Sequence, residues 1–269
     1  MPLRTTSDPA EVEAVITPAL EADPVRNNIL STIRSVIRAG AGEPWCAYDG
    51  DALAVRGRPD TPVTLAGQWG AVGELAAELA TFEQLDAVGG SVADVERVAA
   101  EMSARGRAEL SRMSERLFRL DRLIEPAPVQ GQARLATEDD VPEAARLFVD
   151  CMAEIWGRAD DEAAAAEMVR GAITTTARLW FWEIDGTVVS FANGRVPAFG
   201  VARVGPVFTP PDLRGRGYAS AVTAAASRDI LEHDAVAVLY TDLANPTSNR
   251  IYQALGYVPV EDRLHVQYR

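Results

Sequence analysis

The chain has 269 residues, a size that predicts two domains, and its 48% hydrophobic and 24% charged residues are ordinary for a globular protein. All 26 basic residues are arginine, which excludes Walker A loops, pyridoxal Schiff bases and other lysine chemistry, and two histidines with two distant cysteines make no zinc site. The net charge of −13 and the lack of a bilayer-length apolar run or secretory signal predict a cytoplasmic protein that binds neither nucleic acid nor membrane.

The first half of the chain alternates helical and strand-like segments. Helical periodicity covers 11–20 and 27–38, and two apolar runs then flank Asp49-Gly50, a pair typical of two-residue hairpin turns. The same order recurs around Asp185-Gly186, 136 positions later. This recurrence favours a tandem repeat of one α/β unit, with coincidence as the alternative.

The middle of the chain contains a break followed by a second set of elements. Two prolines and a glycine between Glu125 and Gln132 interrupt the apolar periodicity, so we place the boundary there, with domains at 1–126 and 130–269. After it, the sequence predicts a helix capped by Thr137, a second helix from Asp160-Asp161-Glu162 to about 177, and a hairpin formed by 179–184 and 187–191.

A strand, a turn and a helix are predicted between 204 and 232. The strand 204–209 ends at a proline pair, and Arg214-Gly215-Arg216-Gly217 leads into a helix that ends at Glu232. Glycines let the backbone approach a ligand closely, and the first turn of a helix offers unpaired amides with a partial positive charge. With two arginines beside it, this turn predicts a diphosphate site, although a glycine turn before a helix is also common for structural reasons.

A second polar segment follows the buried-type strand 235–240. Asn245 is placed to cap a helix that has Pro246 at its first position and Gly256 just beyond its end. At about 100° per residue, Asn245, Asn249 and Tyr252 fall on one stripe of this helix, whereas its apolar residues point elsewhere. Capping and solvation alone also account for such a face.

Together, the two segments resemble the GCN5-related N-acetyltransferase (GNAT) superfamily over residues 132–269. Arg214 to Ala219 fits the family's Arg/Gln-x-x-Gly-x-Gly/Ala signature, and Asn245 to Tyr257 is similar to its asparagine, helix, tyrosine and glycine-aromatic segment. The resemblance implies an α/β (α+β) fold of two tandem acyl-CoA N-acyltransferase-like domains, each a mixed, mostly antiparallel sheet flanked by helices. The segment 117–123 also resembles tandem bacterial members, in which the first domain is degenerate.

The resemblance implies acetyl-CoA as the cofactor and assigns its site. Pantetheine would bind the backbone of one strand, diphosphate would lie on the 214–219 turn, and Tyr252, with an unperturbed pKa of about 10, would protonate the departing thiolate. The identity of the general base stays open, because the strand 204–209 has no titratable residue. The alternatives are Asp242, Glu183, a water chain and an amine that arrives already neutral. The implied cofactor-binding residues are Val207, Phe208, Thr209, Arg214, Gly215, Arg216, Gly217, Tyr218, Ala219, Asn245, Ser248, Asn249 and Tyr252.

The function expected from these features is transfer of an acetyl group from acetyl-CoA to a primary amine, on a small molecule or peptide, by direct attack. Cys151 is expected to pack in the core rather than carry an acyl group. The alternative function is a non-catalytic CoA-binding sensor or interaction module. The sequence also leaves open whether the chain forms a homodimer. Asp160 and Asp161 either attract a cationic amine or cap their helix. The first domain is expected not to bind CoA, because segment 78–83, which the 136-residue offset aligns with the turn, has neither glycine nor arginine.

Overall fold

In the computed structural model, which describes residues 3–157, 161–175 and 177–268, the contacts divide the chain into two units. The first unit consists of Met1–Leu117, Tyr240–Pro246 and Pro259–Arg269, and the second of Phe118–Leu239 and Thr247–Val258. This division differs from the linear boundary at 126–130 predicted from the sequence. The reason is that the chain re-enters the first unit after residue 239, and its last strand, β12 (Tyr257–Tyr268), pairs antiparallel with β5 (Ala87–Ser91).

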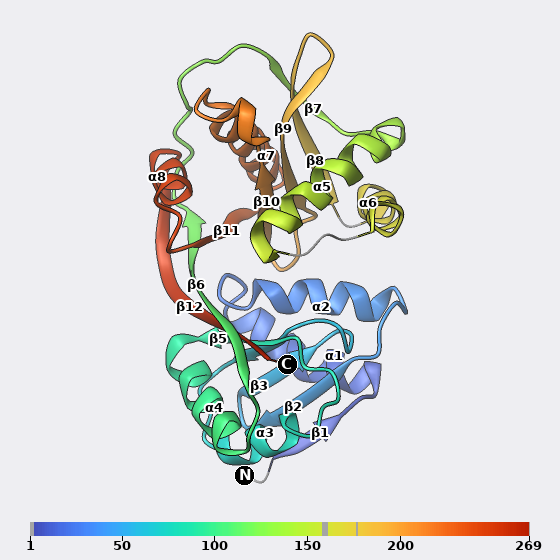
Figure 1. The fold of residues 1–269 in the computed structure, drawn as a ribbon, viewed down its shortest axis with the longest axis vertical. Coiled ribbons are helices and arrows are strands. Elements are labelled where there is room, and N and C mark those ends of the chain that lie inside the picture. Colours follow the sequence, from blue (N-terminus) through green and yellow to red (C-terminus); the bar gives the residue numbers. More distant parts are fainter. Residues whose placement is uncertain (1–2, 158–160, 176, 269) are drawn as a thin grey trace. The chain divides into compact units, whose positions relative to one another are not determined.

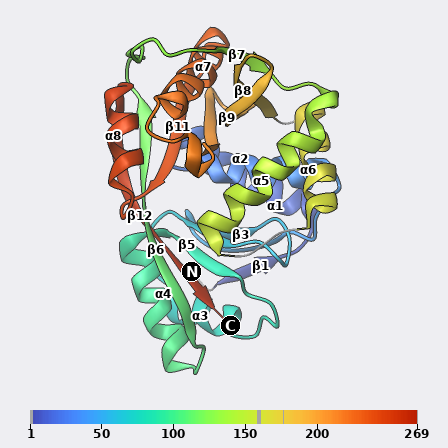
Figure 2. The same cartoon turned by 45° about the horizontal axis from the view of Figure 1, so that its top comes forward.

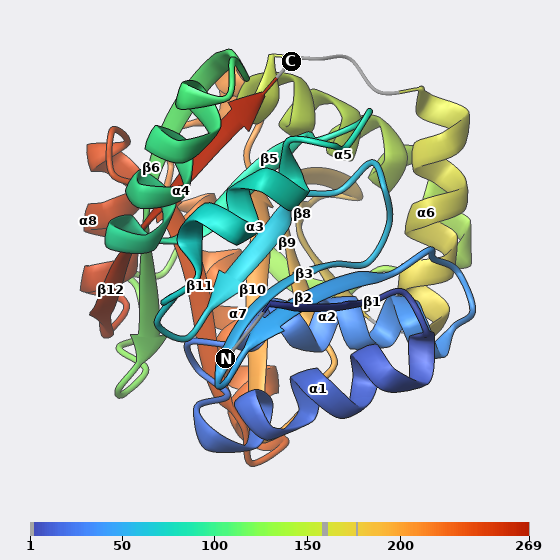
Figure 3. The same cartoon turned by 90° about the horizontal axis from the view of Figure 1, so that it is seen from below.

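The first unit is a mixed sheet with helices on both faces (Figure 1). Its strands lie in the order β1-β2-β3-β4-β5-β12, and the pairs are antiparallel except for the parallel pair β4–β5. Helices α1 and α2 pack together, as do α3 and α4 (Figure 3). The elements are β1 (Arg4–Thr6), α1 (Pro9–Ala22), α2 (Asn28–Arg38), β2 (Trp45–Asp49), β3 (Ala52–Arg56), β4 (Val63–Ala66), α3 (Val72–Leu79), β5, α4 (Val92–Ala104) and β6 (Glu109–Leu120).

Local sequence explains where these elements begin and turn. The Asp8 carboxylate caps α1 by accepting hydrogen bonds from the Ala10 and Glu11 amides, each 2.9 Å long. Val12, Ile16 and Leu20 lie on one stripe of this helix and are completely buried. The hairpin predicted at Asp49-Gly50 joins β2 to β3, with Gly50 at a φ of +62° that suits glycine. The predicted helices of the first half and this hairpin are therefore confirmed.

The second unit has the same kind of mixed sheet, in the order β7-β8-β9-β10-β11, with only β10–β11 parallel (Figure 2). The hairpin predicted at Asp185-Gly186 joins β8 to β9, with both residues at positive φ. The elements are β7 (Gln132–Leu135), η1 (Glu138–Asp140), α5 (Val141–Trp156), α6 (Glu162–Thr175), β8 (Ala177–Ile184), β9 (Thr187–Arg195), β10 (Val201–Phe208), η2 (Pro211–Leu213), α7 (Tyr218–Glu232), β11 (Val236–Asp242) and α8 (Pro246–Ala254).

Two cores cover the faces of the second sheet. On one face, Phe181, Phe191 and Phe208 pack against apolar residues of α5 and α6. On the other face, small residues of β9 and β10 pack against α7, α8 and the aromatic side chains of Tyr252 and Tyr257. The alternation along β9 and β10 thus places the end of β10 between two packed layers.

The two halves of the chain repeat one order of elements. Each runs strand, two helices, three antiparallel strands, helix, parallel strand, helix and strand, from β1 to β6 and from β7 to β12. The counterpart of the segment between β10 and α7 is therefore 67–71, between β4 and α3. The alignment of that segment with 78–83 is wrong, because Glu78 and Leu79 lie in the last turn of α3. A fixed offset fails because the connecting segments of the two halves differ in length.

Candidate functional site

The parallel strands β10 and β11 separate within the second unit. They pair only from Val201–Val236 to Arg203–Val238 among the residues described, although β10 continues to Phe208. Beyond that point the register of β10 against β9 shifts between Val204 and Val207, as a bulge does, and bulges bend a strand. The open side of β10 offers backbone groups for a ligand at the carboxyl ends of the parallel pair.

The end of β10 is held firmly by a serine of β9. The buried Ser190 hydroxyl donates to the Phe208 carbonyl at 2.9 Å and lies 2.8 Å from the Thr209 hydroxyl. Phe208 is buried on the α5 side of the sheet, and Val207 is half-buried on the α7 side. The segment of three residues predicted to line the pantetheine arm is thus tied to β9 through Ser190.

The predicted diphosphate turn leads from β10 into α7. Gly215 and Gly217 have φ values of +76° and +84°, which side chains other than glycine's rarely allow, and Gly217 is the N-cap of α7. A Cβ on Gly217 would lie 2.8 Å from Val129 Cγ1, whereas one on Gly215 would meet nothing. No side chain caps this helix, so its first-turn amides beside Tyr218 and Ala219 are available to an anion.

The two arginines of the turn are anchored differently from each other. Arg214 donates to the Thr209 carbonyl at 2.9 Å and to the Glu154 carboxylate on α5 at 2.5 Å. Arg216 donates to the Asp212 carbonyl within the turn at 3.2 Å. Arg214 therefore ties the turn to α5 in this conformation, and contact of either guanidinium with a diphosphate stays a prediction.

Tyr252 of α8 is buried in the α7-side core. Its ring lies 6.2 Å from that of Tyr257 in an edge-on arrangement, and the cluster includes Val204 of β10. Burial, together with the nearby Cys151 thiol, raises the pKa of Tyr252 to about 12. The phenol thus keeps its proton at neutral pH, as a general acid requires. Ser248 and Asn249 lie half-buried on the preceding turn of the same helix.

By their contacts, Asp242 and Asn245 belong to the first unit. The Asp242 carboxylate accepts a hydrogen bond from the Ala244 amide at 2.7 Å, and its carbonyl accepts one from the Asn245 amide at 3.0 Å. These bonds form a turn that leads to Pro246, the first residue of α8, as predicted. The catalytic role of Asp242 stays a prediction.

The remaining candidates have mostly structural surroundings. Glu183 forms an ion pair with Arg134, which also pairs with Asp140 at 2.8 Å and helps to lower the pKa of Asp140 to about 2. Burial raises the pKa of the Cys151 thiol to about 12, so it is no ready nucleophile. Asp160 lies outside the described residues, while Asp161 accepts from the Ala163 amide at 2.9 Å at the start of α6.

Sequence reasoning missed two residues that shape this site. Ser190 fixes the end of β10 from 19 positions away, and Glu154 holds Arg214 from 60 positions away. Neither a strand serine nor a helix glutamate carries a local signal for such a contact. Among the described residues, no group of three or more His, Cys, Asp or Glu could hold a metal ion, and no helix is both long and apolar enough to cross a membrane.

In the second unit, a mixed sheet lies between layers of helices, and its parallel pair opens and leads through a glycine turn into a helix N-terminus. This arrangement defines an acyl-CoA N-acyltransferase-like domain. Residues 141–257 match the model of the Acetyltransferase (GNAT) family, so the second half of the chain carries a GNAT domain. No curated protein matches the chain.

Similar solved structures extend the likeness to the whole chain. A GCN5-related N-acetyltransferase from Sphaerobacter thermophilus has a TM-score of 0.64 at 17% identity, over 99% of this chain and 95% of that one. A tandem GNAT protein from the clavulanic acid biosynthesis pathway has a TM-score of 0.60 at 13% identity, over 99% and 98%. A GCN5-related N-acetyltransferase from Kribbella flavida has a TM-score of 0.59 at 19% identity, over 81% and 86%. These likenesses show a tandem GNAT fold, as the sequence predicts.

Proposed function

We propose that this chain is an acetyl-CoA-dependent N-acetyltransferase that transfers the acetyl group to a primary amine of a small molecule or peptide. The observation that carries the proposal is the opening between β10 and β11, which continues through Gly215 and Gly217 to the uncapped N-terminus of α7. Acetyl-CoA combines an extended amide-bearing arm with a diphosphate, and these two features match the strand end and the helix terminus in order.

Each part of the site has a role in this binding mode. The backbone of β10 at Val207 and Thr209 pairs with the amides of pantetheine, and the turn with its two arginines receives the diphosphate. The helix α8, with Ser248 and Asn249 beside Tyr252, lines the cofactor, and Asn245 precedes it. The proposal places the enzyme in the cytoplasm and leaves a homodimer to be tested by its mass in solution.

The chemistry is a direct attack of the neutral amine on the thioester carbon. The C–N bond forms, the C–S bond breaks, and the proton of the Tyr252 phenol goes to the departing sulfur. The phenol is protonated at neutral pH with its raised pKa, as it would be at the ordinary value of about 10, so the acid is available before each turnover. Burial of Cys151, with its raised pKa, argues against an acyl-enzyme intermediate. Asp242 remains the proposed base, beside a water chain or an amine that arrives neutral.

A panel of primary amines, assayed for release of free CoA from acetyl-CoA, tests the activity. We expect release that depends on one class of amine, with the acetylated amine detected by mass. Incubation with acetyl-CoA alone is expected to leave the protein unmodified, and a Cys151→Ala variant is expected to keep its activity. An acetylated protein would contradict direct attack.

A CoA-binding sensor is the second candidate. It is favoured by one observation, the absence of any titratable residue between Val204 and Thr209 on the opened strand. Saturable binding of acetyl-CoA, without CoA release for any amine in the panel, is the result that this alternative predicts.

A further inference from the structure

The opening between β10 and β11 has its apex at Arg203. Among the residues described, Arg203 and Val238 are the last to pair between these strands, and β10 continues beyond them to Phe208. In the proposed binding mode, the pantetheine arm runs from the α7 turn along Thr209 and Val207 toward this apex. The acetyl end of the arm therefore points to Arg203, and the amine has to reach the same place.

The side chain of Arg203 lies on the face of the sheet that α5 and α6 cover. Its neighbours on β10, Ala202 and Val204, pack into the core on the α7 side, and successive residues of a strand point to opposite faces. On β9, Phe191 packs on the α5 side, and Arg195, four residues later, has the same orientation. Both arginines thus belong to one face.

The two arginines are also next to each other across the strands. Val204 of β10 pairs with Gly194 of the antiparallel β9, which places Arg203 beside Arg195. Both side chains are half-buried. Burial, together with the charge of Arg203, lowers the pKa of Arg195 to about 10, so the guanidinium still carries its charge at neutral pH. Two like charges across one strand pair destabilise a sheet by themselves.

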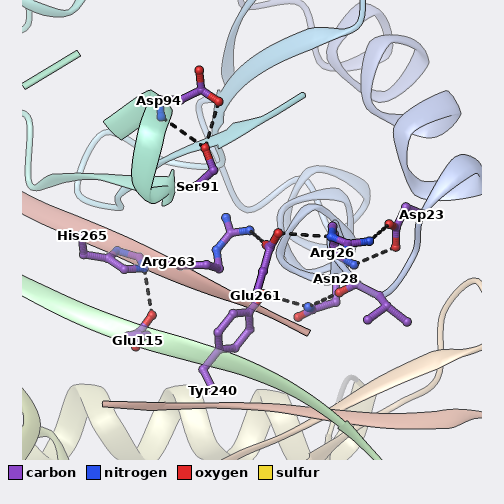
Figure 4. Close-up of polar contacts among 11 residues, drawn as sticks. Asp23, Arg26, Asn28, Ser91, Asp94, Glu115, Tyr240, Glu261, Arg263 and His265 are labelled. Atoms are coloured by element: carbon purple, nitrogen blue, oxygen red, sulfur yellow. Dashed lines mark hydrogen bonds and ion pairs between the residues drawn. The ribbon is translucent and has the colours of Figure 1, made fainter. Parts of the chain in front are cut away.

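No carboxylate of the described residues neutralises Arg195. Its side chain makes no hydrogen bond or ion pair with any of them, and neither β9 nor β10 contains an acidic residue. Other arginines with little exposure are paired: Arg178 of β8 donates to Asp229 at 2.6 Å, and Arg263 of the first unit donates to Glu261 at 2.7 Å (Figure 4). Arg195 is therefore able to accept an anion from outside the chain.

We propose, building on the proposed acetyl transfer, that Arg195 and Arg203 bind an oxyanion of the acceptor, so that the substrate is a primary amine that carries a carboxylate or a phosphate. Guanidinium groups bind both oxyanions through paired hydrogen bonds. The bound anion supplies the negative charge that the strand pair lacks, and it holds the amine of the same small molecule within reach of the apex. The two arginines determine specificity and take no part in proton transfer.

Pairs of amines that differ in one oxyanion test this substrate class. Free L-amino acids are compared with their carboxamides, and phosphoethanolamine with ethanolamine, by release of CoA from acetyl-CoA. We expect kcat/KM to be at least about tenfold higher for the anionic member of one kind of pair, mainly through KM. A carboxylate raises the pKa of its own amine and so leaves less of it neutral, which works against this preference and does not produce it.

Arg195→Gln removes one of the two charges. It is expected to raise KM for the preferred anionic amine about tenfold or more and to leave kcat/KM for the uncharged member of the pair unchanged. Arg195→Lys keeps the charge without the paired N–H groups, so part of the loss should be recovered. Because repulsion from Arg203 is relieved, the Tm of Arg195→Gln should stay or rise. The matched control is Arg146→Gln, an exposed arginine of α5 that pairs with Glu143.

Failure of this inference is distinguishable from failure of the proposed function. If amines are acetylated but the anionic members have no advantage, or if Arg195→Gln keeps that advantage, the inference is overturned and acetyl transfer stands. If no amine is acetylated, calorimetric titration of the same pairs into the full chain with CoA present decides. Preferred binding of an anionic member that Arg195→Gln weakens about tenfold would support the oxyanion site, and equal binding of both members, or by both proteins, would overturn it.

Discussion

At the scale of single residues, the environment of Tyr252 decides whether the proposed acid can work. Tyr252→Phe keeps the ring and its packing against Tyr257 but removes the proton donor. The expected result is a fall in kcat of roughly 10²–10⁴-fold with little change in acetyl-CoA affinity or stability, because only a transition-state interaction is lost. Steady-state kinetics on the active amine measure it. Unchanged turnover would remove Tyr252 from the mechanism.

Tyr257→Phe is the matched control for that variant. Tyr257 lies in the same aromatic pair, but its hydroxyl is bonded to the buried Ser227 hydroxyl at 2.7 Å. Its loss should lower the free energy of unfolding by about 1 kcal/mol, the typical net value of one hydrogen bond, because Ser227 keeps its bond to the Thr223 carbonyl, while kcat stays near that of wild type.

The two cysteines predict how stability depends on alkaline pH. Burial raises the pKa of Cys46 and Cys151 from 9.0 to about 12. Because these thiols hold their protons more tightly when folded, their contribution is fully present below pH 9 and is lost as the pH rises toward 12. Urea unfolding across this window is expected to show a smaller decline for the Cys46→Ala, Cys151→Ala variant. An equal decline for both proteins would assign the loss to other groups.

At the scale of elements, the turn between β10 and α7 offers two glycines for a matched comparison. Both have positive φ, but only Gly217 faces a neighbour, Val129 Cγ1. Gly215→Ala should lower the free energy of unfolding by about 1 kcal/mol through strain, and Gly217→Ala should lower it further through the clash. Thermal melts measure both. In a Gly217→Ala background, Val129→Ala is expected to restore part of the loss, and no restoration would show that the contact does not matter.

Local signals predict these elements well because each can be recognised in consecutive residues. The two Asp-Gly turns and the glycine turn before α7 are of this kind. Pairs that join distant elements have no such signal, as Ser190 with Thr209 and Glu154 with Arg214 show. The polar groups that hold the site in place therefore emerge only from the folded chain.

At the scale of the whole molecule, the return of the chain to the first unit is the feature that linear sequence reasoning missed. A proline-rich segment marks a break in periodicity, but it carries no sign that Pro259–Arg269 belongs with residues before it. The same return places Arg263 beside Ser91, so the complete sheet of the first unit could not be predicted from the residues of the first half alone.

The last prediction concerns how many acetyl-CoA molecules the whole chain binds. Separate pieces 1–126 and 130–269 are unsuitable, because the first would lack the strand that pairs with β5. In the intact chain, calorimetry is expected to give a stoichiometry of one, since the turn after β4 has no arginine and Leu65 lies over Gly90 at the end of β5.

The double variant Arg214→Ala, Arg216→Ala locates that one site. It should weaken acetyl-CoA strongly and leave a pantetheine-only analogue nearly unaffected, because the two guanidinium groups are assigned to phosphate. Equal losses for both ligands would show that the arginines hold the fold of the turn rather than the diphosphate, as the bond of Arg214 to the Thr209 carbonyl permits. A stoichiometry of two would mean that the first unit also accepts the cofactor. Unchanged acetyl-CoA affinity in the double variant, at a stoichiometry of one, would remove the two arginines from the diphosphate site.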